Sequence, residues 1–402
     1  MRVAFLTAGG LAPCLSTSIA YLIEIYQKMA PSVELLGYRY GYTGLLRGDL
    51  QKFSPAAIRD AELLVNFGGS PLGNSRVKLT NDDDLLRKGL ITAGQSGLAR
   101  AAERLKIDKI NVLHTIGGDD TNTTAADLAA YLAEQGYNLQ VVGLPKTIDN
   151  DIIPVRQSLG ADTAADVAVL YAKNFLAEHT ATERVLLVHE VMGRHCGFLT
   201  AQAAAKYHAE VQATKFFGHG FDDREQWDVH GVYIPELSLD LETEGKRLKK
   251  VLNDVGNVNI FVSEGSVPEE LFHQIDAPLD AFGHVSMEYV NAGKWLGDQL
   301  QTRIGAEKVL VQKSGYYSRS AASNKFDRKL IYKACQKAVE AALNGDSGLI
   351  GQDDNTDNFH DTFHPHDDMQ IIDFRRVAGS KAFDINSPWF VDFLKDIGQS
   401  SV

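Results

Sequence analysis

Short apolar runs alternate with amphipathic stretches along most of the chain. The apolar runs predict strands at residues 3–7, 33–38, 63–67, 109–116, 139–144, 184–191, 231–235, 258–263 and 308–313. Apolar side chains spaced by three or four predict helices at 16–28, 96–105, 122–134, 162–177, 198–207, 242–252, 285–304 and 326–343. Strands that alternate with helices indicate an α/β fold, with parallel sheets covered on both faces and right-handed crossovers. Residues 345–368 are rich in Asp, Asn, Gly and His. They are predicted to form a surface loop, without a metal site because the histidines lack regular spacing.

Composition narrows the class of protein. A chain of 402 residues with 44% hydrophobic and 23% charged residues is typical of a globular enzyme with about two to three domains. A net charge of -12 without a Lys/Arg block argues against nucleic acid or a membrane surface as partner. No apolar run approaches the ~18 residues of a membrane helix, and a strand predicted from Val3 argues against a signal peptide. The three scattered cysteines show neither zinc nor disulfide spacing, as expected for a cytoplasmic protein.

Glycine-rich and charged clusters follow the predicted strands. The clusters are Gly9-Gly10, Gly68 to Lys78, Gly117 to Asp120, Pro145 to Asp151, Met192 to Gly197, Glu264-Gly265 and Ser314 to Arg319. The carboxyl ends of parallel strands share one edge of a sheet, and ligands bind at that edge. We therefore expect these clusters to carry the chemistry.

The residue types in the clusters favour phosphoryl transfer. A strand, a glycine loop and a helix aim backbone N–H groups at a phosphate, and an arginine such as Arg76 can contact it with two hydrogen bonds. Adjacent carboxylates at a helix start, Asp119 and Asp120, suit either helix capping or magnesium. Phosphoryl transfer needs such charge neutralisation and positioning, together with a base for the acceptor hydroxyl.

Four motifs in order carry a resemblance to a known family. Gly-Gly-Asp at 117–119, Thr-Ile-Asp-Asn-Asp at 147–151, Met-Gly-Arg at 192–194 and Glu-Gly at 264–265 resemble the phosphofructokinase family, over about residues 3–345. The resemblance implies two similar three-layer α/β domains with largely parallel sheets and an active site in the cleft between them. It also implies Mg²⁺, fructose 6-phosphate as acceptor at its 1-hydroxyl, and a homodimer or homotetramer.

The resemblance also suggests approximate domain limits. Residues 1–160 with 315–370 are expected to form the phosphoryl-donor domain, and residues 161–314 with 371–402 the sugar-phosphate domain. The chain is expected to cross between the domains more than once.

The resemblance assigns catalytic roles residue by residue. Asp149 matches the general base, flanked by Thr147 and Asp151 as substrate or magnesium contacts, and Ile148 matches a substrate contact. Asp119 matches the magnesium-linked aspartate.

Further matches concern the sugar phosphate and the donor. Met192, Gly193 and Arg194 match the segment that holds the sugar, with Arg194 near the transferring group and Glu264 accepting a sugar hydroxyl. The 6-phosphate is expected to meet a Tyr-x-x-Arg set, with added charge from the preceding lysine: Lys313, Tyr316, Tyr317, Ser318 and Arg319. Arg184 matches an arginine that reaches a neighbouring subunit's sugar phosphate, and Gly10, Arg76 and Lys78 match pyrophosphate contacts. His195 and Cys196 are expected to pack behind the site as core residues.

Two departures from the ATP-using pattern indicate the donor. Asp120 replaces the last glycine of Gly-Gly-Asp-Gly, and Lys146 replaces a small residue before Thr-Ile-Asp. A carboxylate at position 120 removes room for the α-phosphate of ATP and adds a like charge. The repulsion between two unit charges is about 4 kcal/mol at ~4 Å and an effective dielectric of ~20. Lys146 adds positive charge beside the transferring group, so both changes resemble the pyrophosphate-dependent branch.

Several alternatives stay open at this point. Asp120 could be only a helix cap, and the enzyme could then use ATP with an unusual donor loop. The chain could also be a regulatory sugar-phosphate-binding subunit, although Asp119, Asp149 and Arg194 are all in place. Acceptor choice depends on pocket shape, so sedoheptulose phosphate or nucleosides remain alternatives to fructose 6-phosphate.

Overall fold

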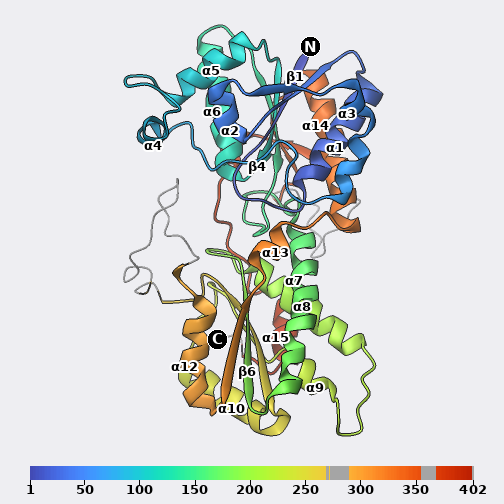
Figure 1. Cartoon of the computed structure of the whole chain (residues 1–402), viewed down its shortest axis with the longest axis vertical. Helices are drawn as coiled ribbons and strands as arrows, with labels where there is room; N and C mark the ends of the chain where they lie inside the picture. Colours follow the sequence, from blue (N-terminus) through green and yellow to red (C-terminus); the bar gives the residue numbers. More distant parts are fainter. Residues whose placement is uncertain (269–270, 272–288, 355–367, 401–402) are drawn as a thin grey trace. The chain divides into compact units, whose positions relative to one another are not determined.

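Two compact units build the protein, and each is an α/β layer structure (Figure 1). A computed structural model describes residues 1–268, 271, 289–354 and 368–400. The first unit comprises Met1–Thr163 and Arg319–Lys381, and the second comprises Ala164–Ser318 and Ala382–Val402. The chain thus returns to each unit after leaving it.

The first unit contains a seven-stranded sheet with the order β11-β10-β5-β4-β1-β2-β3. The inner strands pair in parallel, and the two edge strands β3 and β11 are antiparallel. The bounds are β1 Arg2–Thr7, β2 Glu34–Tyr38, β3 Leu50–Lys52, β4 Val112–Gly117, β5 Gln140–Pro145, β10 Gly348–Gly351 and β11 Gln370–Ile372. The largely parallel arrangement confirms the predicted fold class.

Helices cover both faces of this sheet because its strands are apolar on both sides. Ala4 and Leu6 of β1 pack in the core under one group of helices, while Phe5 contacts the ring of Tyr26 on α1 across the other face. The first group is α2 (Gly41–Arg47), α5 (Gly97–Ile107) and α6 (Asp119–Glu134), and the second is α1 (Leu15–Met29) and α14 (Lys325–Asn344). Shorter elements are α3 (Pro55–Arg59), η1 (Ala61–Asn66), α4 (Asp82–Arg87) and η4 (Phe374–Arg376).

The second unit contains a four-stranded, fully parallel sheet with the order β7-β8-β6-β9. Its strands are β6 (Val185–Val191), β7 (Gly231–Tyr233), β8 (Asn257–Ser263) and β9 (Lys308–Lys313). Helices α10 (Leu241–Val255) and α12 (Ala292–Ile304) cover one face, while α7 (Ala161–Leu176) and α8 (Phe198–Ala213) cover the other (Figure 1). Shorter elements are η2 (Ala177–Ala181), α9 (Arg224–Trp227), α13 (Gly315–Arg319) and α15 (Pro388–Asp396).

Three predicted elements differ in the structure. The predicted strand at 63–67 is wrong: residues Ala61–Asn66 form the 3-10 helix η1, and Leu63 and Phe67 are exposed rather than buried in a sheet. The predicted surface loop at 345–368 is wrong in part, because Gly348–Gly351 is the buried strand β10 beside β5. The predicted helix at 285–304 begins only at Ala292, where Asn291 has left-handed backbone angles. Residues 285–288 and 355–367 lie outside the described residues.

In the part of the chain that the structure describes, no helix combines the length and apolar character needed to cross a membrane.

Candidate active site

In the first unit, Lys146 links two of the predicted clusters. It directly follows β5, where its backbone N–H donates to Gly117 O at 2.8 Å and so joins the end of β4. The Lys146 side chain is buried and its Nζ donates to Gly10 O at 2.7 Å, in the loop after β1. The backbone and side chain of Lys146 therefore link the ends of β1, β4 and β5.

The loop after β1 is held so that two cations approach it. Asn74 Nδ2 donates to Gly9 O at 3.2 Å and to Gly10 O at 3.3 Å. A Cβ on Gly10 would lie 3.3 Å from Arg76 Nη2, and one on Gly9 would lie 3.2 Å from Lys146 Nζ. A side chain at either position would crowd the two cations, and the φ of 82° at Gly9 also favours glycine there. Two of the predicted donor contacts, Gly10 and Arg76, are thus brought together with Lys146.

The pKa of Lys146 is lowered in this setting. Burial disfavours the ammonium form and is the main cause, and the nearby Arg76 guanidinium lowers the pKa further. The Asp149 and Asp151 carboxylates act in the opposite direction. A buried cation of this kind is poised to gain from an anionic ligand, which would offset its desolvation.

Asp119 and Asp120 form the first turn of α6, as the sequence predicts. Lys78 Nζ donates to Asp120 Oδ1 at 2.9 Å, so the predicted pyrophosphate contact Lys78 is an ion-pair partner of the predicted donor-selecting carboxylate. The space beside Gly118 is open, because a Cβ built there would have only Lys146 O within 4 Å, at 3.9 Å. Burial raises the pKa of Asp119, and the Asp120 and Asp151 carboxylates raise it further.

The loop with the predicted base is held by its own side chains. Thr147 Oγ1 donates to Asp151 Oδ1 and accepts from the Asp149 N–H, both at 3.1 Å. Asn150 has a φ of 54°, and Ser158 N–H donates to its Oδ1 at 2.7 Å. Asn150 therefore fixes the turn that presents Asp149, while Ile148 is buried beneath it.

The acidic residues of this unit fit magnesium in the form that phosphoryl-transfer enzymes use. No cluster of three or more His, Cys, Asp or Glu side chains suited to a metal occurs among the described residues. Mg²⁺ is, however, usually bound by one or two carboxylates together with substrate phosphates. The mutual repulsion of Asp119, Asp120 and Asp151, seen in the raised pKa of Asp119, would be relieved by such a cation.

In the second unit, Met192, Gly193 and Arg194 follow the carboxyl end of β6. Gly193 has a φ of 135°, a conformation that favours glycine, and its N–H points to Glu264 Oε1 at 3.4 Å. Ser263 Oγ donates to Gly193 O, and Gly265 N–H donates to the same oxygen at 3.2 Å. The structure therefore brings together the predicted Met-Gly-Arg and Glu-Gly motifs.

Burial raises the pKa of the Glu264 carboxyl group. The Gly193 N–H lowers it and Glu190 raises it, while Arg194 and Lys313 lower it. Glu264 thus lies in a field of opposing charges at the end of the sheet.

Lys313 ends β9 and pairs with Glu190, which faces it across the parallel ladder. Lys313 Nζ lies 2.9 Å from Glu190 Oε1, and the Gly293 N–H of α12 donates to Glu190 Oε2 at 2.8 Å. Glu190 is buried, so both its oxygens use protein partners. Glu190 is not among the residues predicted from the sequence. The signal that could have identified it is a carboxylate that interrupts the apolar run of β6.

The Tyr-x-x-Arg set forms the short helix α13. Tyr316 and Tyr317 are about half exposed, Ser318 is buried, and the Tyr317 ring lies 5.9 Å from that of Tyr171. Tyr316 and Arg319 are three residues apart, which places them on one side of a helical turn. Met192 packs against the start of this helix, since a Cβ on Gly315 would lie 2.7 Å from Met192 Cε.

The structure also places His195, Cys196 and Arg184, which lie around β6. Cys196 is buried as expected, but the prediction for His195 is wrong because its side chain is exposed. Gly197, which directly precedes α8, donates its N–H to Glu236 Oε1 at 3.0 Å and so holds the chain next to the buried Cys196. Arg184 precedes β6 and donates to Gly305 O at 3.2 Å, so it lies at the opposite end of that strand from Arg194.

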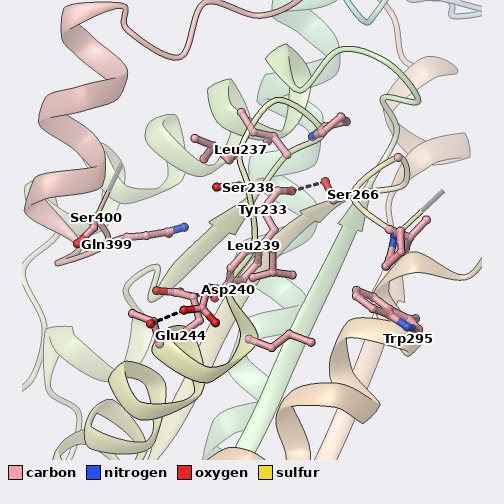
Figure 2. A pocket seen from close by; sticks show the side chains of 17 residues that line it. Tyr233, Leu237, Ser238, Leu239, Asp240, Glu244, Ser266, Trp295, Gln399 and Ser400 are labelled. Carbon is pink, nitrogen blue, oxygen red and sulfur yellow. Dashed lines mark hydrogen bonds between the residues drawn. The ribbon is translucent and has the colours of Figure 1, made fainter. Parts of the chain in front are cut away.

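A separate cavity of about 330 Å³ lies beyond β7 and β8 in the second unit (Figure 2). Tyr233 OH donates to Glu244 Oε2 at 2.7 Å, and Ser266 Oγ donates to Tyr233 O at 2.9 Å. Asp240 and Glu244 line it, and its described lining includes no Lys or Arg. Such a lining does not suit a phosphate, so the cavity is no substitute for the clusters above.

Comparisons with known proteins agree with this arrangement. The phosphofructokinase family model matches residues 2–342. The chain is 52% identical to a pyrophosphate–fructose 6-phosphate 1-phosphotransferase of Propionibacterium freudenreichii subsp. shermanii, over 99% of this chain and 98% of the relative. It is 50% identical to a protein of the same name from Mastigamoeba balamuthi, over 99% and 96%.

Among solved structures, the fold is similar to a pyrophosphate-dependent phosphofructokinase from Marinobacter aquaeolei. The TM-score is 0.72 at 20% identity, over 100% of this chain and 92% of the other. A match at that identity concerns the fold alone. The family match over most of the chain, together with the two close relatives, establishes that this protein belongs to the phosphofructokinase family.

Proposed function

We propose that the protein transfers a phosphoryl group reversibly from pyrophosphate to the 1-hydroxyl of fructose 6-phosphate, with Mg²⁺. The products are fructose 1,6-bisphosphate and phosphate. The observation that carries the donor assignment is the buried Lys146 ammonium at Gly10 O, beside Arg76. The names of the two close relatives support the same reaction.

Lys146 and Asp120 select the donor in this proposal. The Lys146 ammonium is desolvated before any ligand arrives, so an added phosphate charge stabilises it more than it would a hydrated lysine. Asp120 occupies the helix start that the ATP-using pattern leaves to glycine, and Lys78 holds it there. The α-phosphate of ATP would meet the Asp120 carboxylate. Pyrophosphate has only two phosphates and would not reach it.

Asp149 acts as the general base. Its carboxylate accepts the proton of the 1-hydroxyl while that oxygen forms a bond to phosphorus and the bridging P–O bond of pyrophosphate breaks, releasing phosphate. Thr147 orients the loop through its bonds to Asp151 and to the Asp149 backbone. Magnesium, held by Asp119 with Asp151 nearby, would supply charge neutralisation of the phosphate oxygens.

Residues of the second unit, together with Arg319 of the first, bind the sugar phosphate. Met192, Gly193 and Glu264 form the wall for the sugar hydroxyls, while Arg194 serves the transferring group. Lys313, Tyr316 and Arg319 serve the 6-phosphate, for which two cations and a phenol hydroxyl are suitable partners. In this proposal the first unit, apart from Arg319, serves the donor, and the second unit serves the sugar phosphate.

Arg184 has a separate role in this proposal. It lies at the amino end of β6, away from Arg194, and serves the sugar phosphate of a neighbouring subunit in a homodimer or homotetramer. Sedimentation would give the subunit number, and Arg184→Ala should raise the KM for fructose 6-phosphate only in an oligomer.

The test is phosphorylation of fructose 6-phosphate with magnesium and either pyrophosphate or ATP, measured in parallel. Turnover with pyrophosphate and not ATP is the expected result. Turnover with ATP alone would contradict the roles given to Asp120 and Lys146. Turnover with neither donor would contradict the acceptor assignment, and sedoheptulose 7-phosphate would then be tried as acceptor.

A further inference from the structure

Residues 376–381 lie beyond the family match, which ends at residue 342, yet they contact the loop that carries the proposed base. The Ile153 N–H donates to Ala378 O at 2.8 Å, and the Ala378 N–H donates to Ile153 O at 3.2 Å. The Lys381 N–H donates to Asp151 O at 2.8 Å. These three backbone bonds attach the 376–381 segment alongside residues 151–153.

The same segment touches the proposed magnesium-linked carboxylate. A Cβ built on Gly379 would overlap Asp119 Oδ2 and lie 2.8 Å from Asp119 Cγ. The φ of Gly379 lies outside the left-handed region, so its backbone would accept alanine. The need for glycine at this position therefore comes from the Asp119 carboxylate and not from backbone strain.

Side chains anchor the segment at both ends. Arg376 contacts the buried Asp353 through Nη1 to Oδ2 at 2.5 Å and Nη2 to Oδ1 at 2.8 Å. Lys381 Nζ donates to Val155 O at 3.0 Å and to Asp354. A bidentate pair with a buried carboxylate holds its geometry better than an exposed ion pair does.

We propose that the 376–381 segment is a positioning element that fixes the Asp119 carboxylate and the backbone at Asp151 for magnesium pyrophosphate. Gly379 forms the surface against which Asp119 rests, and Arg376 and Lys381 keep that surface in place. This inference rests on the proposed function of the same site. It adds a part that the family motifs do not contain.

Gly379→Ala tests the contact directly. The methyl group should displace the Asp119 carboxylate and weaken the binding of magnesium pyrophosphate about tenfold, in the range found when residues behind a metal ligand are changed. Calorimetry without sugar phosphate measures that Kd with no turnover. The magnesium concentration for half-maximal rate should rise as well, and excess magnesium should restore much of kcat. The KM for fructose 6-phosphate should change by less than about twofold.

Neighbouring arginines on η4 provide a matched pair of variants. Arg376→Ala removes the anchor to buried Asp353 and should weaken magnesium pyrophosphate binding. Arg375→Ala removes only an exposed pair with Asp373 and should leave that Kd unchanged. Thermal unfolding of each variant shows whether the protein is folded. A loss of stability in Arg376→Ala without a change in Kd would contradict the inference.

Outcomes separate this inference from the proposed function. If the wild type uses pyrophosphate but Gly379→Ala binds magnesium pyrophosphate as tightly, the segment has no positioning role. If the wild type uses ATP instead, the proposed donor is wrong, and the same comparison with magnesium ATP decides the inference. Equal Kd values for wild type and Gly379→Ala would again overturn it, and weaker binding by the variant would support it.

Discussion

The buried ammonium of Lys146 donates a 2.7 Å hydrogen bond to the carbonyl oxygen of Gly10, which joins the end of β5 to the loop after β1. A lysine in this position is both a structural link and a cation next to the expected pyrophosphate. Replacement by Met keeps the length of the side chain and removes the charge. Lys146→Met should lower kcat/KM for pyrophosphate by about two orders of magnitude or more, as for other lost charge contacts to a transition state. Steady-state kinetics with varied pyrophosphate would show it, and an unchanged kcat/KM would exclude Lys146 from donor binding.

The pH dependence of the reaction follows from the lowered pKa of Lys146. The ammonium form, which is the proposed pyrophosphate-binding form, is present below its pKa, and burial brings that pKa below its usual value. Activity should therefore fall as pH rises through the pKa, and Lys146→Arg should move this alkaline limb to higher pH because arginine stays charged. The profile of kcat/KM for pyrophosphate against pH checks this. An alkaline limb that stays in place in Lys146→Arg would assign it to another group.

Removal of the proposed base should separate chemistry from binding. Asp149→Ala should lower kcat by about 10²- to 10⁴-fold, the usual range for a general base, with little change in the Kd for fructose 6-phosphate. Calorimetry and single-turnover kinetics measure the two quantities. Near-normal kcat in this variant would remove Asp149 from the role of base.

The Glu190–Lys313 pair predicts a coupled effect on the acceptor. Glu190→Gln should release Lys313 and raise the KM for fructose 6-phosphate several-fold, with a smaller change in kcat. If Glu190 acts through Lys313, the double variant with Lys313→Met should be no worse than Lys313→Met alone. Glu244→Gln, which removes the charge of a partly buried carboxylate elsewhere in the same unit, is the control for general destabilisation. Additive effects in the cycle would show that Glu190 acts independently of Lys313.

The stability of the second unit should depend on pH through His208. Its Nδ1 lies 2.7 Å from Asp228 Oδ1, and this hydrogen bond raises the pKa of His208. The contribution is fully present below the unfolded pKa of about 6.5 and is lost as pH rises through the higher folded pKa. Between pH 6 and 9 the wild type should lose about 1 kcal/mol more than Asp228→Asn, a typical net value for one hydrogen bond in a protein. Urea unfolding at several pH values measures the difference, and parallel curves for the two proteins would contradict the assignment.

The strand ends could be predicted because parallel strands place their carboxyl ends at one edge of a sheet, which is where Asp119, Lys146 and Gly193 lie. The error at 63–67 shows the limit of that approach. Five residues with four apolar side chains are as compatible with a 3-10 helix as with a strand. Tertiary packing determines which of the two forms. Strand β10 was missed for the converse reason: four residues with glycine at both ends become a strand only through pairing with β5 and β11.

Two features of the site depend on register and on contacts distant in sequence. Glu190 meets Lys313 because β6 and β9 pair with these residues opposite each other. Gly379 meets Asp119 across 260 positions of the chain (379 minus 119). Neither contact leaves a local pattern that spacing or composition could detect.

The most direct test of donor selection is the kinetics of the double variant Asp120→Gly/Lys146→Gly with pyrophosphate and with ATP. We expect the ratio of kcat/KM for ATP to that for pyrophosphate to rise by at least about two orders of magnitude. The variant removes the Asp120 carboxylate and the Lys146 ammonium, and so restores the space and charge of the ATP-using pattern. A variant that loses pyrophosphate turnover without any gain in ATP binding would contradict the claim that Asp120 and Lys146 determine the donor.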